Sequence, residues 1–473
     1  MHDPTTAPAM RRPGLILAVL CLGSLGASLM QTLVIPIQGD LPRLLNTSHS
    51  NASWVVTVTL LAGAVVMPVA GRLSDILGRQ RILAASAVLL ALGSALCAVA
   101  DSLLPMLAGR TLQGLAMGYV PVAINLVRSV VPPARVPTSI AMLSATMGVG
   151  GSIGMPMAAW IAQEHDWHTL FVVSGGVALV VLALTLCFIP HLPPEHPSTF
   201  DPVGAAGLAV GLGAVLIGVS KGNDWGWGSL ATSGCIVAGA LVLLAWGTHQ
   251  LRARNPLVDL RVSARAPVLL TNIAAMLTGF GMMASSIVVP QLLTMPTATG
   301  HGLGQTVLQA GLWLTPGGVV MMLIAPVSGR LISRLGPRPT LALGNLVLGL
   351  GYLISLLAMD SPVSLMLAMC VGCAGVALAF ASMPTLILAN VPFSESGSAV
   401  GLNGLMRAVG TTSAGAVMAA LLLSHTVPLG PYDVPSQAAF QLCFATGIAA
   451  TMVGAIVSML IPDRSRGAAL ASA

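Results

Sequence analysis

Ionisable side chains are rare in this chain, yet two arginines stand inside long apolar stretches. Only 7% of the 473 residues are charged. An arginine in mid-membrane costs roughly 2.5–3.5 kcal/mol on insertion scales, so it needs a polar partner or a wet cavity. Gln113 follows Arg110 by three residues, and Asn403 precedes Arg407 by four, so each pair shares one face of a helix. We predict that both faces point inward, because lipid offers no hydrogen bonds.

Two interpretations stay open for these arginines. Arg110, together with Gln113, either relays protons and orients polar substrate groups, or acts as a hydrogen-bonded strut. For Arg407 the strut is the favoured interpretation, and a place in a substrate cavity is the alternative. The other candidate cavity residues are Gln31, Asn272, Gln291, Trp313, Asn345 and Asn403. The 24 methionines suit a cavity for varied apolar ligands, although filling the helix interiors is their plainer role.

Acidic residues are missing from the middle of every apolar stretch. All 14 fall in expected loops or at helix ends. A proton-coupled carrier ordinarily needs a titratable group along its pathway, so this distribution weakens a proton-coupled mechanism. Asp40, at the outer end of the first apolar run, is the best remaining candidate for proton exchange, and an ordinary loop acid is the alternative.

A short charged stretch, residues 71–81, joins two apolar runs and returns later in the chain. A related stretch begins 258 positions further on, at residues 329–339. Five residues are identical at that offset: Gly71, Arg72, Leu73, Leu77 and Gly78. We predict a cytoplasmic gating loop whose working residues are Gly71, Arg72, Asp75, Gly78, Arg79 and Arg81. A repeated charged turn between long apolar helices indicates a duplicated membrane bundle.

The composition predicts an all-α integral membrane protein. Hydrophobic residues make up 55% of the chain and the mean hydropathy is +0.90. Apolar runs of about 20 residues recur, each long enough to cross a hydrocarbon core of ~30 Å. We predict fourteen spans, at 14–37, 52–71, 82–100, 103–127, 138–162, 169–189, 202–220, 230–249, 267–294, 307–328, 340–359, 362–388, 398–423 and 438–461.

The basic residues predict the orientation of these spans. With the N-terminus inside, sixteen of the 20 basic residues lie in inside loops or tails, and only Arg43 and Lys221 lie outside. Both termini are then cytoplasmic. The expected parts are a tail (1–13), a six-helix bundle (14–189), a linker with two extra spans (190–266), a second six-helix bundle (267–461) and a tail (462–473).

Other classes of function find little support. There is no phosphate-binding loop for ATP, no metal-ligand spacing and no catalytic constellation, so we expect neither an enzyme nor a cofactor. The net charge of +6 comes from dispersed arginines and predicts no nucleic-acid partner. Cys370 and Cys373 have the spacing of a redox pair, but they lie in an apolar run and are expected to be inert. We expect a monomer in the lipid bilayer.

Four stretches together resemble the major facilitator superfamily, and more narrowly its fourteen-helix drug:proton antiporter branch (the QacA/EmrB-like multidrug efflux branch). The charged stretch 71–81 resembles the loop between helices two and three. The other three are Arg110-x-x-Gln113-Gly114, Asp166 to Phe171, and Gly401-Leu402-Asn403 followed by Arg407 and Gly410. The resemblance covers nearly the whole chain and implies two six-helix bundles with an inserted helix pair.

The chain also departs from this branch at two places. Met30 stands where the branch usually has a carboxylate in helix one. The helix-five antiporter motif is eroded: Gly151 and Pro156 match it, but Met155 replaces a glycine. We retain Gly151, Gly154 and Pro156 as helix-packing residues.

The resemblance implies a secondary transporter of the bacterial inner membrane that exports hydrophobic or amphiphilic compounds, such as drugs and antibiotics, with protons as coupling ion. A carrier for one metabolite, siderophore or lipid, and a receptor that moves nothing, stay as alternatives. Asp75 is expected to cap a neighbouring helix or to pair with Arg79 or Arg135. We predict that it holds the two bundles together at the cytoplasmic side and so stabilises the outward-facing state. The repeat has Ser333 at the matching position and lacks this charge.

Overall fold

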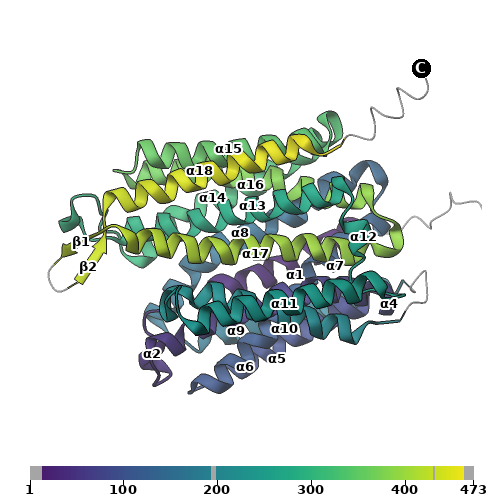
Figure 1. The fold of residues 1–473 in the computed structure, drawn as a ribbon, viewed down its shortest axis with the longest axis horizontal. Coiled ribbons are helices and arrows are strands. Elements are labelled where there is room, and N and C mark those ends of the chain that lie inside the picture. The colour runs from purple at the N-terminus through teal and green to yellow at the C-terminus, as the bar shows by residue number, and fades with distance from the viewer. Residues whose placement is uncertain (1–12, 193–198, 430–431, 463–473) are drawn as a thin grey trace, which may run out of the picture.

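The structure is a computed structural model that describes residues 13–192, 199–429 and 432–462. Within these ranges the chain is almost entirely helical (Figure 1). Nearly all of the two predicted cytoplasmic tails lies outside the described residues. So do residues 193–198, near the beginning of the expected linker.

The first part of the chain, up to Phe188, forms one group of helices. Its elements are α1 (Pro13–Thr32), α2 (Leu41–Leu44), α3 (His49–Ala52), α4 (Trp54–Leu77), α5 (Arg79–Ala98), α6 (Leu103–Leu115), η1 (Ala116–Gly118), α7 (Tyr119–Val130), η2 (Pro133–Arg135), α8 (Val136–Glu164) and α9 (Thr169–Phe188). We call these elements the first half.

The rest of the chain contains a helix pair and a second group. The pair is α10 (Pro202–Trp225) and α11 (Leu230–Arg252), followed by α12 (Leu260–Ser263). The second group, called the second half, comprises α13 (Ala266–Thr294), η3 (Thr297–Thr299), α14 (Val307–Leu335), α15 (Pro337–Leu357), α16 (Pro362–Asn390), η4 (Phe393–Glu395), α17 (Ser396–Ser424), β1 (Thr426–Leu429), β2 (Tyr432–Pro435) and α18 (Gln437–Leu460). The hairpin of β1 and β2 is antiparallel and was not expected from the sequence.

Thirteen helical segments within the described residues are long and apolar enough to cross a membrane. This agrees with the expected all-α membrane fold. The predicted span 103–127 has a different form, because the 3-10 turn η1 divides it into α6 and α7. Pro121 has no N–H to bond the carbonyl four residues earlier, that of Met117, and Met117 lies in this turn. The count of fourteen spans therefore stays a prediction.

The two halves pack side by side along two pairs of long helices. Helix α8 packs against α14, and α4 packs against α17. In Figure 1, α15 and α18 lie on one side of the molecule and α5 and α6 on the other. Small residues allow the close approach in both pairs: an added Cβ on Gly329 would lie 2.6 Å from Cα of Thr138.

We name the two ends of the molecule by their contents. The end where α4 ends and α17 begins is the latch end, and the opposite end, with α2 and the β1–β2 hairpin, is the hairpin end (Figure 1). Helix α10 packs on α4, α17 and α11. Helix α11 lies outermost, and its Leu230 is 88% exposed, as expected for a side chain that faces lipid.

Candidate functional site

The predicted gating loop is mostly helical. Helix α4 continues to Leu77 and α5 begins at Arg79, so Gly78 alone separates them, with φ at 95°. The repeat behaves in the same way, with Gly336 at φ 91° between α14 and α15. Glycine adopts this left-handed conformation without steric cost, which explains why both copies keep it. The expected loop boundaries were therefore wrong, and the charged residues occupy helix ends.

Asp75 lies on the last turns of α4, where they meet the start of α17. Its Oδ1 accepts a hydrogen bond of 3.0 Å from Asn125 on α7, and Oδ1 of Asn125 accepts one of 2.9 Å from Ser396. The backbone N–H of Ser398 also approaches the Asp75 carboxylate. An acid at a helix N-terminus faces the positive end of the helix dipole, so the arrangement matches the expected cap.

The backbones of α4 and α17 touch directly beside Asp75. An added Cβ on Gly71 would lie 2.6 Å from the carbonyl carbon of Gly397. Arg72 is buried next to this contact, with 8% of its surface exposed, whereas Arg81 faces outward. Only glycine therefore fits where the two halves cross.

Two arginines of the first half enclose an aromatic ring of the second. The guanidinium carbons of Arg79 and Arg128 lie 5.1 Å and 5.0 Å from the ring centroid of Phe393. Arg79 also donates a hydrogen bond to Ser129. Cation–π contacts contribute about 0.5–2 kcal/mol each. We call Gly71, Asp75, Arg79, Asn125, Arg128, Phe393, Ser396 and Gly397 the latch; Arg128 and Phe393 were missed from the sequence, where nothing marks their pairing.

Arg110 is sealed inside the first half, with 1% of its surface exposed. Its Nε donates to the carbonyl of Val55 at 3.2 Å, and Nη1 donates to the carbonyl of Met30 at 3.1 Å and to Oε1 of Gln113 at 2.7 Å. Gln113 in turn donates to Ser94 at 3.0 Å. These are the contacts of an interior strut that joins α1, α4, α5 and α6.

Arg407 lies in the other half, apart from Arg110. Its guanidinium carbon stands 4.6 Å from the ring centroid of Phe380 on α16. One turn earlier, Asn403 donates a hydrogen bond of 3.0 Å to Asn272 on α13. The structure therefore separates the two buried arginines, and only Arg110 has the bonds of a strut.

The remaining candidate residues are dispersed. Asp40 is exposed at the hairpin end, where it pairs with Arg43 at 3.9 Å. Gln31 donates to the sulfur of Met117 at 3.5 Å, and Trp313 donates to Gln305 at 3.0 Å. These three residues do not form one site with the arginines.

The expected helix-packing residues of α8 lie against two neighbours. Gly151 and Gly154 face Thr32 of α1, and an added Cβ on Gly154 would lie 3.4 Å from the carbonyl oxygen of Leu29. Pro156 faces α14, where an added Cβ on Gly311 would lie 3.2 Å from its nitrogen. The three residues thus occupy the packing surfaces of α8, and their role stays a prediction.

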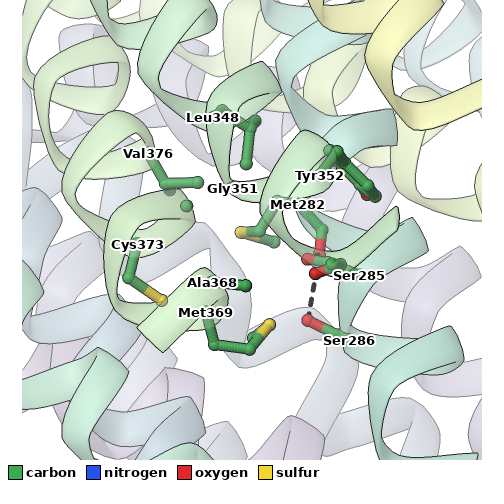
Figure 2. Close-up of a pocket in the computed structure, with 12 residues that line it drawn as sticks. Met282, Ser285, Ser286, Leu348, Gly351, Tyr352, Ala368, Met369, Cys373 and Val376 are labelled. Atoms are coloured by element: carbon green, nitrogen blue, oxygen red, sulfur yellow. Dashed lines mark hydrogen bonds between the residues drawn. The ribbon is translucent and has the colours of Figure 1, made fainter. Parts of the chain in front are cut away.

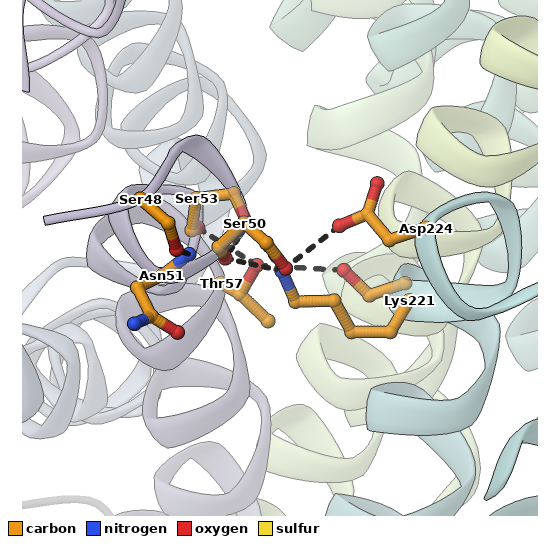
Figure 3. A network of polar contacts seen from close by, with 8 residues as sticks. Ser48, Ser50, Asn51, Ser53, Thr57, Lys221 and Asp224 are labelled. Carbon is orange, nitrogen blue, oxygen red and sulfur yellow. Dashed lines mark hydrogen bonds and ion pairs between the residues drawn. The ribbon is translucent and has the colours of Figure 1, made fainter. Parts of the chain in front are cut away.

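Lys221 was expected in an outer loop, and this was wrong. Helix α10 runs to Trp225, so Lys221 lies within it and is 1% exposed. Figure 3 shows its ammonium group among partners from α3, α4 and α10. It donates to the carbonyl of Ser50 at 2.9 Å, to Asp224 at 3.0 Å and to the hydroxyl of Ser53.

The same end of α10 also reaches the second half. Asn223 donates a hydrogen bond of 3.2 Å to the carbonyl of Ala416 on α17. We call Lys221, Asn223 and Asp224 the clasp, because they join the hairpin ends of α4 and α17 through a third helix. The spacing of Lys221 and Asp224, three residues apart, is a helical pair that the sequence already contained.

A small cavity of about 40 Å³ lies within the second half, between α13, α15 and α16 (Figure 2). Three of its polar groups are already bonded: Ser285 and Ser286 both donate to the carbonyl of Met282 at 2.9 Å, and Tyr352 donates to that of Gly281. Drug-sized ligands need pockets of roughly 300–1,000 Å³. This cavity is therefore too small to hold a transported compound in this structure.

Comparison with known proteins decides the family. The family profile described as Major Facilitator Superfamily matches residues 20–415. The chain belongs to this superfamily. The fold agrees: the human organic anion transporter MFSD10 superposes with a TM-score of 0.66 over 94% of this chain and 99% of that one, at 18% identity.

Two relatives within the superfamily have export or resistance in their names. The tetracenomycin C resistance and export protein of Streptomyces glaucescens is 27% identical over 433 residues, which is 90% of this chain and 79% of that protein. The multidrug resistance protein Stp of Mycobacterium tuberculosis is 27% identical over 389 residues, 81% of this chain and 71% of that one. For several curated relatives the aligned part is under two thirds of their length, such as 65% and 62%.

Membership of the Major Facilitator Superfamily confirms the coarser expectations. The protein is a multi-pass membrane protein of a transporter superfamily that acts on small molecules. Nothing in the comparisons points to catalysis. The fourteen-helix branch, the coupling ion and the individual site residues stay predictions.

Proposed function

We propose that this protein is a secondary transporter that exports hydrophobic or amphiphilic small molecules, including drugs and antibiotics, by alternating access. The latch is the observation that carries the proposal. It joins the halves at one end through a buried glycine crossing, the approach of the Ser398 N–H to the Asp75 carboxylate, and two cation–π contacts. Such an interface can separate as a unit and re-form, as rocking of two bundles requires. The names of the two relatives support the direction of transport and the class of cargo.

The membrane topology that we propose is the one expected from the sequence. We infer that α6, η1 and α7 together cross the membrane once, which makes fourteen spans with the thirteen long helices. In this arrangement α10 and α11 are an inserted pair between bundles 14–189 and 267–461, as in the fourteen-helix antiporter branch. The latch end then faces the cytoplasm with both termini, in a bacterial inner membrane, and the structure corresponds to an outward-facing state.

Protons remain the proposed coupling ion. The acidic side chains of the described residues lie at helix ends or between helices. Asp40 is exposed and pairs only weakly with Arg43, whereas Asp75 contacts the interface that has to open. We therefore favour Asp75 over Asp40 as the group whose protonation is linked to the movement of the halves.

Transport in vesicles tests the proposal. Inverted membrane vesicles that contain the protein should accumulate a fluorescent amphiphile when their interior is made more acidic than the medium. Collapse of this pH gradient should release the amphiphile. Vesicles with the Asp75→Asn variant should lose most of this gradient dependence. Accumulation equal to that of vesicles without the protein would contradict transport, and accumulation unaffected by the gradient would contradict proton coupling alone.

A further inference from the structure

Arg407 has a guanidinium group with almost no partners. It lies near the middle of α17, and its one described interaction is the contact of 4.6 Å with the Phe380 ring. Within the described residues, no hydrogen bond or ion pair engages its nitrogens. The guanidinium of Arg110, by contrast, is hydrogen-bonded: its Nε and Nη1 donate to carbonyls and to Gln113. The N–H groups of Arg407 are therefore available to a ligand.

The nitrogens of Arg407 are not fully enclosed by protein atoms. Fully enclosed nitrogens without a partner do occur among the described arginines, at Nε of Arg72 and Nη1 of Arg128. None of the Arg407 nitrogens is enclosed in this way, although the side chain as a whole is partly buried. A partly buried cation in mid-membrane whose nitrogens have no partner and are not fully enclosed indicates a wet cavity or a ligand position.

The surroundings of this guanidinium are apolar. Phe380 is 2% exposed and presents its ring to the cation. Gly279 lies under the aliphatic part of Arg407, where an added Cβ would be 2.9 Å from Cγ. One turn earlier, the sulfur of Met67 packs on Gly404, where an added Cβ would lie 2.7 Å away. The guanidinium thus stands beside one aromatic ring, and a thioether packs on the same helix one turn earlier; both kinds of group suit the body of a hydrophobic ligand.

No carboxylate compensates this cation at the same depth. The described acidic residues within helices stand at their ends, as Asp75 does two residues before the end of α4 and Asp224 one residue before the end of α10. A site with one unpaired cation in a low-dielectric setting attracts anions and repels other cations. Binding of an organic cation there would add a second uncompensated charge.

We propose that Arg407 binds the anionic group of the transported compound, so that the substrates are amphiphilic organic anions such as carboxylates on a hydrophobic body. This assignment rests on the proposed transport function and names its substrate class. The planar guanidinium donates two parallel hydrogen bonds to a carboxylate, and the Phe380 ring behind it fixes its plane. The apolar body then lies against the aromatic and methionine side chains at the interface of the halves.

A matched pair of probes tests the substrate class. 9-Anthracenecarboxylate and (9-anthracenylmethyl)trimethylammonium share the ring and differ in charge. Their affinities for the purified full chain in detergent follow from thermal stabilisation at several concentrations. The carboxylate should bind at least about tenfold more tightly than the ammonium, as expected when a charged pair replaces a charge conflict.

Variants of Arg407 connect that preference to the residue. Arg407→Gln should weaken the carboxylate at least about tenfold and should not weaken the ammonium, because it removes the repelling charge. Arg407→Lys keeps the charge without the fork and should be intermediate for the carboxylate. Arg43→Gln, at an exposed arginine, is the matched control and should change neither affinity. Two results would overturn the proposal: tighter binding of the ammonium than of the carboxylate to the unsubstituted chain, or an unchanged carboxylate affinity in Arg407→Gln. If that variant does not purify, Arg407→Lys decides: a loss of about threefold or more supports the site, and no loss overturns it.

Flux of both probes in proteoliposomes distinguishes the anion site at Arg407 from the proposed transport function. Transport of the carboxylate that depends on Arg407 supports both. Transport of the ammonium without the carboxylate overturns the anion site and leaves an exporter. Absence of flux for both probes contradicts the proposed function and the anion site together.

Discussion

The latch and the clasp connect the same two helices, α4 and α17, at opposite ends and in different ways. At the latch end the backbones of the two helices touch, and Asp75 bonds Asn125 beside the start of α17. At the hairpin end α10 stands between them, with Lys221 bonded to Ser50 and Ser53 just before α4 and Asn223 bonded to α17. At the latch end, α4 and α17 can separate by breaking their direct contact. At the hairpin end, they can separate only if α10 loses its bonds to one of them.

The bonds of the clasp are unequal, and this indicates which side is released. The charged Lys221 donates to Ser50 and Ser53, and its ammonium lies 5.1 Å from the Trp54 ring centroid of α4; its third partner, Asp224, is on α10 itself. Asn223 contributes a single neutral bond to α17. Charge-assisted bonds are roughly twice as strong as neutral ones. We expect α10 to stay bound to α4 when α4 and α17 move apart at the hairpin end.

The largest effect is expected from Gly71→Ala at the latch. The added methyl group would collide with the Gly397 backbone, so α4 and α17 have to separate, and transport should fall more than about tenfold while the protein still inserts. Spin labels at the exposed residues Leu77 and Ser394 measure the separation. Gly213→Ala is the matched control, because no atom lies within 4 Å of its added Cβ. An unchanged label distance would show that the glycine crossing does not hold the latch.

Asp75→Asn should have a smaller effect in the same direction. The amide can keep a hydrogen bond with Asn125 but loses the charge that faces the N-terminus of α17, which is worth about 1 kcal/mol. The population open at the latch end should therefore rise roughly fivefold. The same two labels measure it, with Asp101→Asn as control at an acid whose side chain is 92% exposed. Equal distance distributions in both variants would argue against the cap.

Lys221→Met tests the stronger side of the clasp. Removal of the ammonium leaves the Ser50 carbonyl and Asp224 without their partner, and we expect a loss of about 2 kcal/mol in resistance to unfolding. Unfolding of the purified protein in detergent measures the loss. Arg43→Met, at an exposed cation, should be nearly neutral. If both variants lose the same resistance to unfolding, the buried contacts of Lys221 do not stabilise the fold.

Asn223→Ala tests the weaker side and should cost about 1 kcal/mol at most. We expect easier separation of α17 from α10 at the hairpin end and little change in unfolding. Labels on α10 and α17 report this separation. The expected asymmetry of the clasp is wrong if this variant lowers stability more than Lys221→Met does.

The smallest effect concerns Asp201, which caps the latch end of α10. Burial opposes its ionisation, but hydrogen bonds from the Gly204 N–H, Gln250 and His249 outweigh it and lower the pKa of Asp201 below its ordinary value. A lowered pKa in the folded state means that the carboxylate stabilises above the unfolded pKa near 3.9, and that this is lost as pH falls through the folded pKa. The difference in stability between the unsubstituted chain and Asp201→Asn should therefore stay constant from about pH 6 down to about pH 4 and shrink towards pH 3. A constant difference across this range would contradict the linkage.

The sequence alone determined the class, the repeated turn and the buried arginines. Apolar runs, the charged stretch 71–81 with its repeat at 329–339, and the face shared by Arg110 and Gln113 are local patterns, and local patterns suffice for helices in lipid. The family motifs extended this to the superfamily, which the profile over residues 20–415 bears out.

Only the tertiary structure decided which helix faces touch. A membrane helix is apolar all round, because lipid and protein interior are equally apolar, so no amphipathic pattern marks its packing face. The bond between Asn125 and Ser396 joins residues 271 positions apart, and the Arg79–Phe393 contact is similarly distant in the sequence. Lys221 seemed a loop residue because lysine is rarely buried, and its partners on α3 and α4 become visible only when α10 is docked. Likewise, the sequence placed Arg110 and Arg407 in equivalent settings, and packing alone satisfied one and left the other open.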